Sequence, residues 1–522
     1  MPCPRRGIAP FVVLILAACG SGRSILEAGN DPRPEQIGSS TTTTLGEPPA
    51  AGSLPTGTGV VPVPPTMPST APPTVPPTTA APLDAYPPCP TDALDRATGP
   101  VEIVYWHGMN ATTEQALVDL VAAYHASQDR VVVRLENQGG YLEAIDKYYQ
   151  AGASARPDLI MFPEYGFQQA VDSGTFVPVG ACLAASGFDT SAILPSTLRA
   201  YAQAGVQWGM PFNVSNPLLY YNKAMFAAAG LDPDRPPADF DELRQVSQQL
   251  VDSGVAAAGL SYDTNVDGGG GWYLEQWFAT AGEMFVNHLN GRAQPATEVL
   301  FDGPTGQFLF STLQALEADG LLVNVGDNAG GTDTLLKLAD QQAPAAMAIA
   351  SSATLGTVIE VLGSGLIPGL TPDDVGVGPL PSLSGTPSAL VGGAANYVVA
   401  GNSDEVTAAV WDFITYLVTP EAQSMWAEAT GYLPITAGAT EIEPLASVYA
   451  SDPRYRVAYD QLVNSPNDAA HAGAVIGPHR QVRAVLAGAL AAVFDGADVA
   501  STLADAAAQA DVLLQQYALL NQ

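Results

Sequence analysis

The sequence predicts an α/β fold with two lobes. Near the start of the folded part, short apolar segments alternate with amphipathic helical segments, as in a largely parallel sheet. About 430 residues follow Cys89, which is more than one hydrophobic core usually holds. The later part of the chain is mostly helical, with clear capping residues at the helix starts.

Five segments between residues 101 and 162 carry the alternation. They are strand 101–106, a helix with Leu117, Leu120, Val121 and Tyr124 on one face, strand 131–135, helix 142–150 and strand 159–162. This β-α-β-α-β order predicts parallel strands, and ligands of such sheets bind beyond the carboxyl ends of the strands. Trp106, His107, Tyr141 and Glu164 all fall at or just past predicted strand or loop ends.

The stretch from Met210 to Lys223 sets small polar residues among apolar ones. Its two prolines disfavour a helix, and the run 218–221 is typical of a covered strand. Asn213, Ser215 and Asn216 are therefore expected to face something polar. The plainer interpretation is a strand that enters a core through a turn.

Helices in the second half are recognised by their caps. Residues 239–251 are predicted to form a helix after two prolines, Ser403 caps a helix with acidic residues in its first turn, and Thr419 caps one with proline at its first position. Residues 483–494 and 503–520 are expected to form a helical end. No long repeat and no second transmembrane segment is predicted.

The chain is strongly acidic, with a formal net charge of -33 and only three lysines. This argues against nucleic acid or anionic lipid as a partner, and a solvated acidic surface is the default interpretation. The motifs of serine hydrolases, P-loop enzymes and zinc proteases are missing, and no catalytic residue, metal or cofactor is expected. A hydrolase with paired carboxylates stays open, because 52 acidic residues offer many pairs.

The amino terminus predicts an export signal. Two arginines precede an apolar run from Ile8 to Leu16 that is too short to span a membrane. Residues 48–83 contain no charged and no aromatic side chain, which predicts a disordered linker with polyproline character. In an exported chain Cys89 and Cys182 are expected to pair, although two free thiols remain the alternative.

Two distant motifs carry a resemblance to a known family. The stretch 210–223, together with Gly431-Tyr432-Leu433-Pro434-Ile435-Thr436, resembles the solute-binding lipoproteins of bacterial ABC importers. Within that family the closest likeness is to the receptors for glycerol 3-phosphate and glycerophosphodiesters, and it covers residues 100–517. The resemblance implies a two-lobed fold like that of maltose-binding protein, with the ligand in the cleft between the lobes.

The resemblance also implies a division of the chain. Leu16-Ala17-Ala18-Cys19 matches the bacterial lipobox, so residues 1–18 would be the signal peptide, Cys19 the lipidated residue and 19–88 a lipid-anchored linker. Residues 89–213 plus 345–395 would form one lobe, and 214–344 plus 396–522 the other. Crossings between the lobes are expected near Asn213 to Ser215 and again near Gly392 to Ala395.

Matching positions to the family implies a set of ligand-binding residues. They are Tyr141, Glu164, Ser215, Ser351, Gly393, Tyr432 and Arg483, to which Trp272 is added because a glycine run at 268–271 suggests a mobile loop presenting an aromatic face. One carboxylate, that of Glu164, can accept from two ligand hydroxyls, and the fork of Arg483 suits the paired oxygens of a phosphate. The backbone N–H of Gly393 is expected to approach the ligand.

Several alternatives remain at these positions. Ser352 competes with Ser351, and Arg480 competes with Arg483. Tyr141 and Trp272 would also suit packing roles, Glu164 and Arg483 would suit an exposed surface, and Gly393 a simple turn. Val214, Asn216 and Phe240 depart from the residues usual in close relatives, and these departures leave the head group of the ligand open.

The resemblance predicts a receptor, not an enzyme. It would capture sn-glycerol 3-phosphate or a glycerophosphodiester such as glycerophosphocholine and pass it to an ABC permease. The expected location is extracytoplasmic, with a lipid anchor as the only membrane contact, and the expected state is a monomer. A receptor for di- or oligosaccharides with the same fold is the alternative, and a secreted hydrolase is the alternative from another class.

Overall fold

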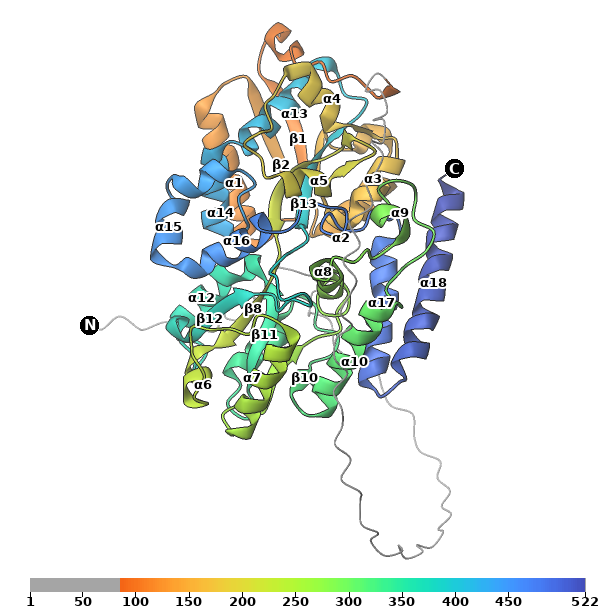
Figure 1. Ribbon diagram of the computed structural model, residues 1–522. Coiled ribbons are helices and arrows are strands. Elements are labelled where there is room, and N and C mark those ends of the chain that lie inside the picture. The colour runs from red at the N-terminus through yellow and green to blue at the C-terminus, as the bar shows by residue number, and fades with distance from the viewer. Residues whose placement is uncertain (1–84, 522) are drawn as a thin grey trace, which may run out of the picture. The chain divides into compact units, whose positions relative to one another are not determined.

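The computed structural model describes residues 85–521. The predicted signal peptide, Cys19 and the linker up to residue 84 lie outside the described residues. The described part contains two mixed sheets, each covered by helices (Figure 1). We call the part built on the first sheet the first lobe and the part built on the second sheet the second lobe.

The first sheet has the strand order β2-β1-β3-β13-β4, with β7 paired to β13. Its strands are β1 (Val101–His107), β2 (Val131–Asn137), β3 (Leu159–Pro163), β4 (Phe176–Val177), β7 (Met210–Ser215) and β13 (Gly392–Val399). β1 is parallel to β2 and β3, whereas β13 is antiparallel to β3, β4 and β7. The predicted parallel alternation is therefore confirmed for its first three strands.

Helices of the first lobe come from two separate parts of the chain. They are α1 (Ala111–Ser127), α2 (Tyr141–Gln150), α3 (Phe167–Asp172), α4 (Val179–Ser186), α5 (Pro195–Ala200), α13 (Asp404–Leu417) and α14 (Pro420–Thr430), with a small hairpin of β5 (Ala202–Gln203) and β6 (Val206–Gln207). Helix α13 packs on β1, and α14 packs on α1. Ser403 and Thr419 cap α13 and α14 as predicted, each accepting a hydrogen bond from a first-turn amide.

The second sheet has the strand order β10-β9-β11-β8-β12. Its strands are β8 (Pro217–Asn222), β9 (Ala258–Tyr262), β10 (Leu322–Asn324), β11 (Ala345–Ser351) and β12 (Val375–Pro379). Its helices are α6 (Lys223–Ala228), α7 (Phe240–Asp252), α8 (Trp272–Thr280), α9 (Asn287–Asn290), α10 (Pro304–Ala318), α11 (Thr332–Leu336), α12 (Leu355–Gly363), α17 (His479–Phe494) and α18 (Val499–Leu520). The last two helices pack on α10, so the carboxyl-terminal end belongs to this lobe.

This pairing corrects the division expected from the sequence. Residues 345–395 were assigned to the first lobe, but β11 and β12 pair with β8 and β9 in the second sheet. Residues 396–522 were assigned to the second lobe, but α13 and α14 pack on the first. The reason is physical: a short apolar strand shows in its sequence that it is buried, but not in which of two sheets it is buried.

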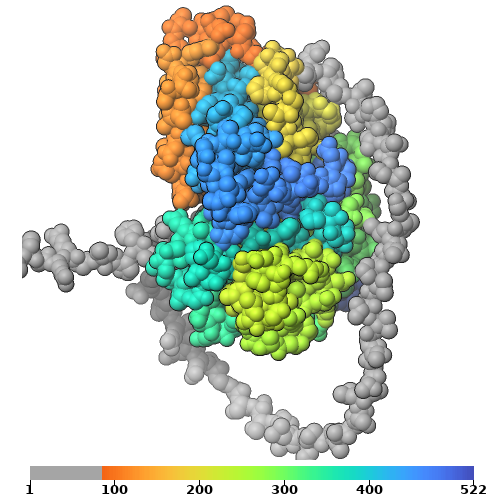
Figure 2. Space-filling view, turned by 60° about the vertical axis from the view of Figure 1, so that its left-hand side comes forward, coloured from red at the N-terminus to blue at the C-terminus, as the bar shows by residue number. Residues whose placement is uncertain are grey.

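Three segments connect the lobes. The first runs from β7 to β8 at Ser215 to Pro217, and the second runs from β12 to β13. The third contains α15 (Leu445–Ser451), which packs on α14 of the first lobe, and α16 (Val457–Val463), which packs on β12 of the second. In Figure 2 this blue segment lies between the orange and yellow surface of the first lobe and the green surface of the second.

A buried polar network joins these three connections. Gln461 donates to the side-chain oxygen of Asn216 and to the carbonyl of Pro217, both at 3.1 Å, and accepts from the amide of Leu380 at 2.8 Å. Asn216 in turn donates to the carbonyl of Ala458 at 3.0 Å. Both amide side chains are almost completely buried. The polar partners expected around Asn216 are thus the other connections themselves.

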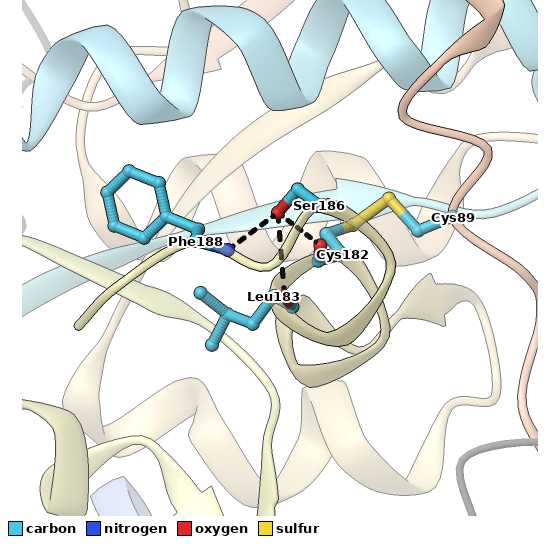
Figure 3. Close-up of a disulfide and its surroundings, with 5 residues drawn as sticks. All are labelled: Cys89, Cys182, Leu183, Ser186 and Phe188. Carbon is cyan, nitrogen blue, oxygen red and sulfur yellow. Dashed lines mark hydrogen bonds between the residues drawn. A yellow bond between two sulfur atoms is a disulfide. The ribbon is translucent and has the colours of Figure 1, made fainter.

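Cys89 and Cys182 form a disulfide, the first of the two alternatives left open by the sequence (Figure 3). Cys89 precedes β1 and Cys182 lies in α4, so the bond ties the start of the described chain to the first lobe. Between residues 85 and 521, no helix is both long and apolar enough to cross a membrane.

Candidate ligand-binding cleft

One cavity, with a volume of about 170 Å³, lies where the two lobes meet. All eight residues predicted to bind a ligand line its wall: Tyr141, Glu164, Ser215, Trp272, Ser351, Gly393, Tyr432 and Arg483. They come from the first lobe, from the second lobe and from the connections between them. Whether each one touches a ligand remains a prediction.

The first-lobe wall follows from parallel strand geometry. Tyr141 begins α2 after β2, and Glu164 begins a single 3-10 turn, η4 (Glu164–Gly166), after β3. Because β2 and β3 flank β1 in the same direction, their carboxyl ends open at the same edge of the sheet. Residues Gly108 to Asn110, which follow β1, line the cavity at that edge as well.

Arg483 lies at the centre of a charged cluster. Its Nε and Nη2 donate to the two oxygens of Glu275 at 2.8 and 2.9 Å, and its Nη1 donates to Glu164 at 3.0 Å. His479 lies one turn earlier on α17, with Nε2 at 2.9 Å from Glu275. Arg483 and Glu275 are 2 % and 3 % exposed. The expected arginine fork is therefore already bound to a protein carboxylate.

The environment of the cluster shifts the pKa values of its members in opposite directions. Burial raises the pKa of Glu164, although Arg483 and His479 oppose this effect. Burial acts in the same sense on Glu275, but there Arg483 and His479 outweigh it and hold the pKa well below its ordinary range. Burial lowers the pKa of Arg483, but the surrounding acids, Glu275 first, together outweigh this effect and raise it, so the guanidinium stays charged. The cleft thus keeps a buried cation beside ionised Glu275.

Arg480, the alternative to Arg483, also lines the cavity. Its Nη2 donates to Asp267 at 3.0 Å, so both arginines of α17 are paired with acids of the second lobe. The ring of Tyr165 lies beneath the guanidinium of Arg483, at 5.9 Å from Cζ to the ring centroid. Glu143 is a further carboxylate in the wall.

Two tyrosines of the first lobe meet in the cavity wall. The hydroxyl groups of Tyr141 and Tyr432 are 3.4 Å apart, and the side-chain amide of Asn213 donates to Tyr141. The ring of Tyr432 stacks on Trp426, which stacks in turn on Phe212. The Tyr432 ring therefore has a fixed orientation that comes from the core of the first lobe.

The structure separates the two competing serines. Ser351 lines the cavity at the end of β11 and caps η6 (Ser352–Thr354). The hydroxyl of Ser352 instead accepts a hydrogen bond from the amide of Asn216 at 3.3 Å, within the first connection. Ser215 lines the cavity at the end of β7. Of the two competing serines, Ser351 is therefore the one that lines the cavity.

The glycine run before Trp272 is tightly packed. A Cβ added to Gly269, Gly270 or Gly271 would lie 2.1 to 2.3 Å from a backbone carbonyl oxygen of the same loop. The mobile loop expected from the sequence is thus a compact turn that admits only glycine. Trp272 starts α8, is 8 % exposed and borders the cavity, while Trp277 is fully buried and has a core role.

Gly393 has a left-handed backbone, with φ of 98°. An added Cβ would lie 1.9 Å from the carbonyl oxygen of Asn213 on the neighbouring strand β7. The glycine is therefore required by strand pairing at the cavity wall, which is a stronger constraint than a simple turn.

Sequence reasoning missed Glu275, His479, Asp267 and the aromatic residues Tyr165 and Tyr273. Glu275 offered a signal, since it is the one charged residue in the mostly apolar run Trp272 to Phe278. A buried acid of this kind needs a buried partner. No group of three or more potential metal ligands is arranged around an ion site anywhere in residues 85–521.

The sequence from residue 119 to residue 456 matches the family described as bacterial extracellular solute-binding protein. The chain belongs to this family. The family expected from the two distant motifs is confirmed.

The sequence is also similar to individual proteins with assigned solutes. The chain is similar to the sn-glycerol-3-phosphate-binding periplasmic protein UgpB of Yersinia pseudotuberculosis, with 28% identity over 434 residues that cover 81% of this chain and 94% of that protein. It is 27% identical to UgpB of Salmonella typhimurium over 401 residues, which cover 76% and 88% of the two chains.

Solved structures establish the fold. UgpB of Mycobacterium tuberculosis in complex with glycerophosphocholine matches with a TM-score of 0.64 and 21% identity, covering 81% of this chain and 100% of that one. The cyclic α-maltosyl-1,6-maltose binding protein of Arthrobacter globiformis matches with a TM-score of 0.65 and 22% identity, covering 80% and 100%. The two-lobed α/β fold expected from the sequence is confirmed, and both solute classes occur on it.

Proposed function

We propose that this chain is the substrate-binding component of an ABC importer that captures a glycerophosphodiester such as glycerophosphocholine, or sn-glycerol 3-phosphate. The observation that carries the proposal is the buried Arg483 in the cavity wall, held between Glu164 and Glu275. Three of its five N–H groups are used by carboxylates, and two are left for a ligand. The similarity to UgpB proteins supports the same class.

Charge favours the diester over the free phosphate. The cluster sets two carboxylates against one arginine, so a dianion placed there meets repulsion as well as attraction. A diester has a single negative charge. A choline group adds a positive charge, which the aromatic faces of Tyr141, Trp272 or Tyr432 are suited to accept.

An oligosaccharide is the second candidate, and a specific observation supports it. One oxygen of Glu164 accepts a hydrogen bond from Arg483, and the carboxylate retains further acceptor capacity for ligand hydroxyls. Aromatic rings in the wall suit stacking on sugar rings as well. For such a ligand Arg483 would support Glu164 instead of binding phosphate.

Calorimetry with glycerophosphocholine, glycerol 3-phosphate, maltose and trehalose separates these candidates. We expect micromolar binding of glycerophosphocholine, about -8 kcal/mol, and weaker binding of glycerol 3-phosphate. Arg483→Ala is expected to abolish binding of the phosphates. Tight binding of a disaccharide with no binding of either phosphate would refute the substrate class while leaving the receptor fold intact.

Release of free choline on incubation with glycerophosphocholine would instead identify a hydrolase. For a receptor, the mechanism is a shift between open and closed lobes. The ligand drives closure only by binding the closed state more tightly than the open state, which contacts from both lobes provide.

We further propose that Cys19 is lipidated and anchors a monomeric receptor outside the cytoplasm. The support is the Leu-Ala-Ala-Cys sequence after a short apolar run. Labelling cells with an alkyne fatty acid is expected to mark the wild-type protein and not Cys19→Ser. Release of the wild-type protein into the medium without label would contradict the anchor.

A further inference from the structure

A second cavity, of about 80 Å³, adjoins the cleft. Four residues line both cavities: Thr113, Gly330, Thr354 and Tyr432. The second cavity runs from this junction along α11 and α12 and ends against Ile367 and Leu370. The two cavities are therefore neighbours that share part of their wall.

The wall of the second cavity differs in chemistry from that of the cleft. None of its 18 lining residues is charged, in a chain with a net charge of -33. Leu335, Leu338, Val358, Val361, Leu362 and Ile367 supply most of the wall, and its polar groups are mainly threonine hydroxyls. The cleft, by contrast, includes Glu143, Glu164, Asp267, Arg480 and Arg483. Of these two adjoining cavities, one is thus polar and charged and the other is apolar.

Both lobes contribute to the apolar end. Thr112 and Thr113, at the start of α1, and Thr430, at the end of α14, belong to the first lobe. The leucine and valine side chains belong to α11, α12 and the residues next to them in the second lobe. An apolar group held here would contact both lobes and would favour their closure.

We propose that the second cavity binds the apolar tail of an amphiphilic solute whose polar head lies in the cleft. This rests on the proposed function, and it narrows the ligand class to glycerophosphodiesters that retain one acyl chain. The tail would leave the polar cleft past Tyr432 and lie between α11 and α12. Leu336 is 40 % exposed at the edge of this cavity, so a longer chain can continue into solvent there.

The size of the second cavity determines how much affinity an apolar tail is expected to add. A water-sized group needs about 10–15 Å³ of such space, so the cavity holds roughly six groups the size of a methylene. Full transfer of one methylene from water is worth about a fourfold gain in affinity, and a partly open cavity gives less. A six-carbon acyl chain is therefore expected to bind at least about tenfold more tightly than the same head group alone.

The test compares glycerophosphocholine with its hexanoyl monoester by calorimetry, using the complete protein and concentrations below micelle formation. A gain of about tenfold or more, with a more negative heat-capacity change, supports the inference. Equal or weaker binding of the monoester, with intact binding of glycerophosphocholine, overturns the tail site and leaves the proposed function standing. Failure of both ligands overturns the proposed function and this inference together.

Two variants test whether the acyl chain binds in the second cavity. Val361→Asp places a charge in the apolar wall, and Thr357→Phe fills the cavity without adding a charge. Each is expected to reduce the ratio of the two affinities from about tenfold to near one, and an unchanged ratio in both would overturn the inference. Val512→Asp is the matched control, because Val512 is 49 % exposed on α18 and lines neither cavity. Thermal unfolding of each variant confirms that it is folded.

Discussion

Arg483 donates to both oxygens of Glu275 within the second lobe, at 2.8 and 2.9 Å, and to Glu164 of the first lobe at 3.0 Å. Glu275 thus fixes the arginine from within the second lobe, and Glu164 contacts it from the first lobe. Both members of the pair Arg483–Glu275 belong to the second lobe. The contact with Glu164 is a link across the cleft.

Removing Glu275 leaves a buried arginine without its main partner. Glu275→Ala is therefore expected to lower the free energy of unfolding by about 3–5 kcal/mol, measured by urea denaturation. Asp92→Ala is the control, since Asp92 and Arg96 form an exposed pair whose loss costs about 0.5 kcal/mol or less. Equal losses in the two variants would show that the buried pair contributes no more than a surface pair.

Asp263 is expected to make the stability of the folded protein depend on pH, in a direction that follows from its raised pKa. It is almost fully buried beneath the loop that carries Trp272, and burial raises its pKa from 3.8 to about 6. Between about pH 4 and 6 the folded state holds a proton that the unfolded state has released, so stability falls as the pH rises through this window. The total loss from this group is about 3 kcal/mol.

Asp263→Asn removes that titration while keeping an oxygen for the amides of Asn265 and Gly269. The variant is expected to gain stability relative to wild type as the pH rises from 4 to 7. Urea denaturation at several pH values measures the difference. Parallel profiles for the two proteins would contradict the assignment to Asp263.

Gln461 is expected to be critical where the three connections meet. Gln461→Ala leaves the amide of Leu380 and the side-chain oxygen of Asn216 buried without this partner, at a cost of about 2–4 kcal/mol in unfolding free energy. Gln509→Ala, on the exposed side of α18, should change stability by about 0.5 kcal/mol or less. A double-mutant cycle with Asn216→Ala should show clear non-additivity, and simple addition would argue against a shared network.

Alanine variants of Gly393 and Gly401 distinguish the effect of backbone strain on stability from that of steric overlap. Both have a left-handed backbone, with φ of 98° and 94°, but an added Cβ overlaps the Asn213 carbonyl only at Gly393 and meets open space at Gly401. Gly401→Ala is expected to cost about 1–2 kcal/mol in stability, from strain alone. Gly393→Ala should cost more and should also weaken ligand binding, because β13 must move away from β7. Similar thermal unfolding and similar affinities in the two variants would refute this difference.

Much of the fold follows from local sequence. The first three strands and their helices appear where hydrophobic periodicity placed them, and α1 buries the predicted Leu117, Leu120, Val121 and Tyr124. Caps at Ser403 and Thr419 are local hydrogen bonds and were predicted. The lobe membership of residues 345–522 was wrong in large part, because it depends on pairing between strands far apart in the chain.

The candidate site, like the fold, could be predicted only in part from the sequence. Its motif residues all line one cavity, although their contact with a ligand is still a prediction. What the sequence did not give is the pairing of Arg483 with Glu275, which are 208 residues apart. Because of this pairing, the guanidinium of Arg483 is not free for a ligand alone but is shared with two acids. Only the folded structure reveals the pairing.

The Cys89–Cys182 bond also has a mechanical consequence. A pull on the chain ahead of Cys89 passes through the sulfur atoms directly to α4, which bypasses the 93-residue span between the two cysteines. That span includes β1, β2 and β3, and with them Tyr141 and Glu164 of the cleft. If the receptor is tethered at its amino terminus, this part of the cavity wall carries no load from the tether, and β1 cannot be peeled from its sheet by tension.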